Sequence, residues 1–117
     1  MATQQIPGLT RTDLQHHDLS VPGKEVIQNR VDIDQDAPAI RHWHPGEEVI
    51  YVLEGTLEYE IDGDPGRIVK AGEALTVPAE RVHSVRNVGD GPAAELATYI
   101  VEKGKPLLTE AVDHAPR

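Results

Sequence analysis

The chain has 117 residues, no cysteine and a formal net charge of −9. This length supports one domain with one core. Without cysteine, disulfides and thiolate ligands are excluded, so any metal would be held by histidine nitrogens and carboxylate oxygens. The acidic surplus without a basic patch argues against nucleic acid or a membrane surface as a partner and favours a small molecule. Residues 1–9 lack the basic start and apolar centre of a signal peptide, which predicts a cytoplasmic protein.

Short β-rich segments separated by turn signals dominate the chain. Residues 1–23 are expected to form an N-terminal arm or to add a short helix near Thr12–Gln15. Strands are then predicted at 26–33, 39–43, 48–53, 56–62, 67–70, 74–77, 82–87 and 95–102. Residues 103–117 are expected to be a polar tail. No segment of 24–102 combines a helical period with caps, so this part is predicted to be one all-β domain, a sandwich or barrel.

One hairpin can be worked out from the two residues Glu54-Gly55. If they form a tight turn, Val52 pairs with Leu57 and Glu48 with Ile61. One face of the hairpin then carries Glu48, Ile50, Val52, Leu57, Tyr59 and Ile61. Glu48 is the one acid among these apolar and aromatic side chains, so protonation, a cation or a metal must neutralise it.

Histidines supply candidate partners for that carboxylate. On a strand His42 and His44 point to the same side while Trp43 points away. His83 follows in a later strand. Three imidazoles and a carboxylate make a nitrogen and oxygen site for one divalent metal, and a six-coordinate ion there keeps two positions open.

These residues resemble the two motifs of the cupin superfamily. Residues 42–48, with Gly55 after six further residues, resemble the first motif, and the second is matched by Gly72, Pro78, His83 and Asn87. The resemblance, to small metal-binding cupins of the quercetin-dioxygenase-like type, implies a double-stranded β-helix, or jelly-roll, over residues 24–102. It also implies metal ligands at His42, His44, Glu48 and His83, and a homodimer. Glu80 departs from the second motif, which usually has glycine there, and a non-glycine residue rarely adopts positive φ.

Three residues are candidates for contact with a substrate. Tyr59 shares the face of Glu48, so its hydroxyl could act in catalysis, or the residue could simply line a pocket together with Ile50. Arg81 lies on the side of His83 at the strand mouth, where it could anchor an acidic substrate or form a surface ion pair.

Three functions are compatible with this sequence. The first is a small dioxygenase that uses one divalent metal, with Fe(II) favoured and Mn, Ni, Cu or Zn as alternatives. The second is a metal-dependent isomerase or lyase without redox chemistry. The third is a module that binds a small ligand without turnover. A dry aliphatic pocket favours the dioxygenase, whereas a dedicated acid–base pair beside the metal would favour the isomerase or lyase.

Overall fold

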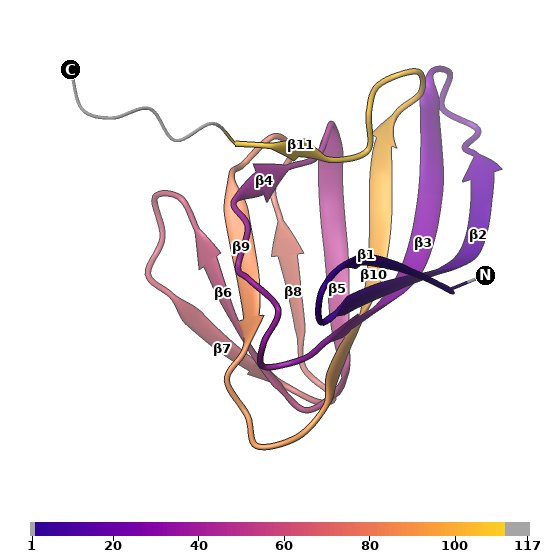
Figure 1. The fold of residues 1–117 in the computed structure, drawn as a ribbon. Coiled ribbons are helices and arrows are strands. Elements are labelled where there is room, and N and C mark those ends of the chain that lie inside the picture. The colour runs from indigo at the N-terminus through magenta and orange to yellow at the C-terminus, as the bar shows by residue number, and fades with distance from the viewer. Residues whose placement is uncertain (1, 112–117) are drawn as a thin grey trace.

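Two antiparallel sheets enclose the core of the protein (Figure 1). The computed structural model describes residues 2–111, with the backbone alone for residues 2–5. In spatial order the six-stranded sheet contains β1 (Ala2–Ile6), β2 (Leu9–Asp18), β3 (Lys24–Ile33), β10 (Ala93–Glu102), β5 (Gly46–Glu54) and β8 (Ala74–Val77). The five-stranded sheet contains β11 (Thr109–Glu110), β4 (His42–Trp43), β9 (His83–Asn87), β6 (Thr56–Ile61) and β7 (Arg67–Lys70). The all-β jelly-roll prediction is confirmed.

The first described residues form strands instead of a helix. β2 pairs with β3 from Leu9 to Asp18, with one irregularity between Asp13 and Gln15, and Thr12 lies opposite Arg30. The short helix considered for Thr12–Gln15 is therefore wrong, because the backbone there is bonded into a sheet. At the other end, β11 pairs with β4. Residues 1 and 112–117 lie outside the described part, and the division into arm, barrel domain and tail stays a prediction.

The hairpin expected around Glu54-Gly55 does not form. β5 pairs with β10 and β8, whereas β6 pairs with β9 and β7, so the chain crosses between the sheets at Gly55. Gly55 has φ +78°, and a Cβ there would lie 2.4 Å from the carbonyl oxygen of Pro92, so the crossing requires glycine. The predicted pairing of the two strands was wrong, but the predicted alternation of inward and outward side chains was right. All six residues expected on the inward face are buried: Glu48, Ile50, Val52, Leu57, Tyr59 and Ile61.

The inward faces of both sheets build an aliphatic core. Strand β5 alternates buried and exposed positions along most of its length, which is typical of a strand with one face on the core and one face in solvent. At its start, a Cβ on Gly46 would lie 1.9 Å from the carbonyl oxygen of Ile100, so β5 and β10 approach closely there. No helix in the described part is long and apolar enough to cross a membrane. The cytoplasmic location stays a prediction.

Candidate metal centre and cavity

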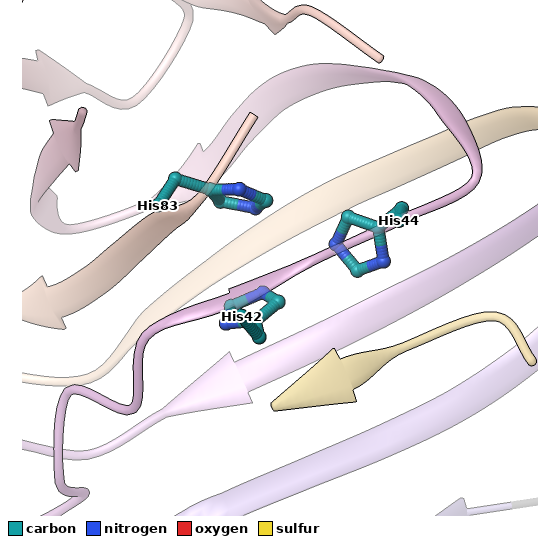
Figure 2. A group of neighbouring side chains, drawn as sticks. All are labelled: His42, His44 and His83. Atoms are coloured by element: carbon teal, nitrogen blue, oxygen red, sulfur yellow. The ribbon is translucent and has the colours of Figure 1, made fainter. Parts of the chain in front are cut away.

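Three histidine side chains meet at one end of the five-stranded sheet (Figure 2). His42 lies in β4, His44 directly follows that strand, and His83 begins β9. His42 and His83 are register partners, so the pairing of β4 with β9 brings them together. One ring nitrogen from each histidine lies within 4.8 Å of the others, within reach of a common ion.

Backbone carbonyls orient all three rings through Nδ1. The acceptors are Ile40 for His42 at 2.7 Å, Leu107 for His44 at 2.8 Å and Arg81 for His83 at 2.9 Å. Because a carbonyl only accepts, each Nδ1 carries the hydrogen, and a neutral ring then keeps the lone pair on Nε2. This arrangement is typical of metal-binding histidines.

Glu48 completes the set of donor atoms. Its Oε1 lies 3.2 Å from Nε2 of His44 and 3.1 Å from Nε2 of His83. Nε2 of His44 is buried and has no hydrogen-bond partner within the described chain. With neutral rings, lone pairs of nitrogen and oxygen would face one another, which is unfavourable unless a cation lies between them. We call His42, His44, Glu48 and His83 the histidine cluster.

The protonation states suit a divalent metal. Burial would raise the pKa of Glu48, but hydrogen bonds from His44 and His83, when their Nε2 carries a proton, outweigh it and hold the pKa below its usual range, as a cation in the place of that proton would. Burial, helped by the charge of His83, lowers the pKa of His42 to about 4. At neutral pH the cluster therefore offers a carboxylate and a neutral imidazole from these two residues, which are the forms that bind metal.

A cavity of about 180 Å³ opens beside the histidine cluster. This is more than ten times the roughly 10–15 Å³ that one water molecule needs, so a small organic molecule fits. His42, Glu48 and His83 line the cavity. Its aliphatic lining consists of Ile6, Leu9, Val31, Ile40, Val85 and Leu108.

A second polar group, which we call the Arg11 group, lines the same cavity. It consists of Arg11 from β2, Tyr59 from β6, and Glu95 and Tyr99 from β10. The Tyr59 hydroxyl donates to Oε1 of Glu95 at 2.5 Å, and Arg11 donates to the Tyr99 hydroxyl at 2.9 Å. Burial, and then the charge of Glu48, raise the pKa of Glu95 to about 8, so this acid holds its proton at neutral pH.

Sequence reasoning missed Arg11, Glu95 and Tyr99 of the Arg11 group. Glu95 shares the period of the apolar residues Ala97, Tyr99 and Val101 along β10, and this signal could have identified it as an inward-facing acid. Arg11 lies in the segment expected to be an arm, where no strand pattern was assigned.

The residues expected to contact a substrate fall in different places. Tyr59 lines the cavity, but Ile50 and Arg81 are not among the described residues that do. Ile50 lies in the core, 1% exposed. The guanidinium of Arg81 donates to the carbonyl of Asp62 at 3.0 Å and to the carboxylate of Asp64 at 3.5 Å.

Glu80 adopts the positive φ that its position in the second motif requires. Its φ is 61°, and it is the one non-glycine residue with positive φ in the described chain. Its amide donates to the carbonyl of His44 at 3.0 Å, so the turn supports the histidine cluster. Asn87 has a structural role, because its amide nitrogen donates to the carbonyls of Ile33 and Gly91.

The fold and the histidine cluster define a small β-barrel with a candidate metal centre. A family model described as "Cupin domain" matches residues 29–101, so the chain belongs to the cupin domain family. The comparisons do not single out the quercetin-dioxygenase-like type, which stays a prediction.

Several known proteins are similar to this chain. "Polyketide synthase CurC" of Streptomyces cyaneus is 37% identical over 76 residues, which cover 64% of this chain and 49% of that protein. "Germin-like protein 1-1" of Oryza sativa subsp. japonica is 36% identical over 88 residues, covering 68% and 41%. The chain thus spans about half the length, or less, of the curated relatives it matches.

Solved structures give the same fold. An RmlC-like cupin from Shewanella frigidimarina superposes with a TM-score of 0.71 at 21% identity, covering 89% of this chain and 86% of that one. Oxalate oxidase in complex with the substrate analogue glycolate superposes with a TM-score of 0.67 at 27% identity, covering 92% and 57%.

Proposed function

We propose that this protein is a metal-dependent enzyme that acts on a small organic molecule, most simply an oxygenase. The observation that carries the proposal is the unpartnered Nε2 of His44, which faces the Glu48 carboxylate beside two further histidines. His42, His44, Glu48 and His83 would hold one divalent transition metal, with Fe(II) favoured and Mn, Ni, Cu or Zn as alternatives. Such an ion supplies Lewis acidity and, where it is redox-active, electron transfer to dioxygen.

The aliphatic lining of the cavity supports the oxygenase class. An aliphatic wall limits the access of water to the reacting centre, and the whole chain has no cysteine and one methionine. The similarity to an oxalate oxidase agrees with redox chemistry at a site of this kind.

A second candidate is a non-redox isomerase or lyase, which the Tyr59–Glu95 pair favours. Glu95 holds a proton at neutral pH and accepts a hydrogen bond from the Tyr59 hydroxyl at 2.5 Å, so the pair can give up a proton at the cavity wall. In this chemistry Tyr59 is the residue that we propose to be catalytic. Ile50 and Arg81 stay sequence predictions as substrate contacts, because neither lines this cavity.

The test is anaerobic reconstitution with Fe(II), followed by oxygen uptake over a panel of diketones, flavonols, phenols and sugar derivatives. Uptake that His44→Ala abolishes supports the oxygenase. The matched control is His17→Ala, an exposed histidine on β2, which should leave uptake unchanged. Absence of uptake with every compound contradicts the oxygenase. Proton exchange of the same compounds in D2O, followed by NMR, then tests the isomerase or lyase, and a negative result leaves ligand binding without turnover.

We also propose a homodimer, formed through the outer face of the six-stranded sheet. Four large apolar side chains are 37–46% exposed on neighbouring strands there: Val49, Tyr51 and Leu53 of β5, and Ile100 of β10. Light scattering after gel filtration should give twice the chain mass. Tyr51→Glu should give the monomer, whereas Val88→Glu, in a loop, should not. A monomeric wild type contradicts this proposal.

A further inference from the structure

Arg11 is a cation on the cavity wall whose bonded partners are both uncharged. Its Nη1 donates to the Tyr99 hydroxyl at 2.9 Å. The buried amide of Asn29, in the orientation that satisfies its neighbours, accepts from the same nitrogen at 2.8 Å. The Tyr99 hydroxyl is uncharged at neutral pH, because tyrosine ionises only at about pH 10. The guanidinium is always charged and has five N–H donors, so donors remain for a further partner.

No described carboxylate lies within ion-pair distance, 4.0 Å, of Arg11. Two arginines nearer the surface do have such partners. Arg30 contacts Asp32 at 3.1 Å, and Arg86 contacts Glu58 at 2.6 Å. Burial costs this half-buried cation part of its hydration, and the more distant Glu48 carboxylate compensates for that cost less than a bonded counter-ion would. An anion in the cavity would remove this penalty.

Tyr99 connects this cation to the histidine cluster. Its ring centroid lies 4.7 Å from that of His44, and the Arg11 guanidinium carbon lies 5.9 Å from the same Tyr99 ring. One tyrosine ring therefore separates Arg11 from His44. Arg11, His42 and His83 also line the same cavity. One small molecule could contact Arg11 and the histidine cluster at the same time.

We propose that Arg11 binds the carboxylate of the substrate, so that the substrate class is a small organic acid. A guanidinium fork matches a carboxylate in two parallel hydrogen bonds. A single negative charge fits better than a phosphate dianion, because the acidic side chains of Glu48 and Glu110 also line the cavity. The aliphatic lining takes the apolar body of the acid. This inference rests on the proposed function, since it names the substrate class of the same cavity. Arg11 lies outside residues 29–101, the part that matches the family.

The test uses acids and their amides of equal shape: glycolate with glycolamide, pyruvate with pyruvamide, and benzoate with benzamide. Affinities are measured by calorimetry on the full chain, both metal-free and loaded with Zn²⁺. At least one acid should bind about ten- to a hundredfold more tightly than its amide, the size expected for charged hydrogen bonds. Arg11→Gln should remove this preference. The matched control, Arg30→Gln on the adjacent strand β3, should keep it.

Equal binding of every acid and its amide, or a preference that survives in Arg11→Gln, overturns the inference. If Arg11→Gln does not fold, the wild type still decides. The side-chain N–H signals of Arg11 should shift in the NMR spectrum with an acid and not with its amide, and unmoved signals overturn the inference. Metal content separates the two proposals. A protein that takes up metal but shows no acid preference refutes the role of Arg11 alone. A protein with the preference but without metal refutes the metal-dependent enzyme.

Discussion

The two polar groups of the cavity are built in different ways. The three rings of the histidine cluster come from β4, the residue after it and the start of β9, and backbone carbonyls fix them through Nδ1. The Arg11 group comes from the strands β2, β6 and β10, and its side chains hold one another, as in the contact of Tyr59 with Glu95. Backbone-held rings present ligand atoms in a fixed geometry, which suits an ion. Side chains that hold one another can exchange protons and partners, which suits a substrate.

The largest expected effect comes from the place where the strands of the two groups meet. Gly46 lies where β5, which carries Glu48, approaches β10, which carries Glu95. Gly46→Ala should lower the free energy of unfolding by about 3 kcal/mol or prevent folding, because its Cβ would overlap the carbonyl oxygen of Ile100. Gly91→Ala, which has open space around it, should change stability by less than about 0.5 kcal/mol. Urea denaturation measures both, and equal effects would contradict this account of the strand contact.

Metal content should separate the two groups cleanly. His44→Ala and Glu48→Ala each remove a proposed ligand, so elemental analysis should find most of the metal lost. Glu95→Gln keeps the shape of its side chain, and Glu95 has no hydrogen bond or ion pair with the described residues of the histidine cluster, so this variant should retain the metal of the wild type. Full metal content in both ligand variants would show that His44 and Glu48 do not hold the metal.

The Arg11 group should make stability depend on pH. The pKa of Glu95 is raised to about 8 in the folded protein, whereas the unfolded chain ionises near its ordinary value of 4.5. Between these values the folded state binds more protons than the unfolded state, so this group makes the free energy of unfolding fall as pH rises from about 4.5 to about 8.

In metal-free protein, Glu95→Gln should therefore show a smaller fall over this pH range than the wild type. Glu60→Gln, an exposed acid on β6, serves as the matched control and should follow the wild type. Urea denaturation between pH 5 and pH 8 checks this. Identical pH profiles for wild type and Glu95→Gln would contradict a raised pKa.

The smallest effect concerns the turn that supports His44. Glu80→Gly should raise the free energy of unfolding by about 1 kcal/mol, because glycine adopts φ 61° without the penalty of a Cβ. Glu80→Ala removes the same charge but keeps the Cβ, so it should bring no such gain. Equal stability of the two variants in urea would refute strain at this residue.

Much of the fold and half of the site could be predicted from local sequence. The strands at 67–70 and 74–77 coincide with β7 and β8, because apolar alternation between turn residues specifies them directly. The His42–His44 spacing identified the histidine cluster for the same reason, since a strand turns alternate residues to one side.

The pairing between strands could not be predicted from the local sequence. Glu54-Gly55 has the chemistry of a tight turn, but the close approach of Pro92 to Gly55 decides that the chain crosses between the sheets. Arg11 reaches the cavity only because β2 joins the sheet beside β3, which is a contact between distant segments. Tertiary pairing of this kind leaves little trace in local periodicity.

The central claim, that the histidine cluster binds one metal through Nε2, is tested most directly by titrating metal-free protein with Zn²⁺ and following the histidine ring nitrogens by NMR. The account predicts that Nε2 of His42, His44 and His83 shifts together and that the shifts are complete at about one ion per chain. The exposed His16 and His17 should not take part at this stoichiometry. Rings that stay unchanged after one equivalent, or shifts confined to the exposed histidines, would contradict it.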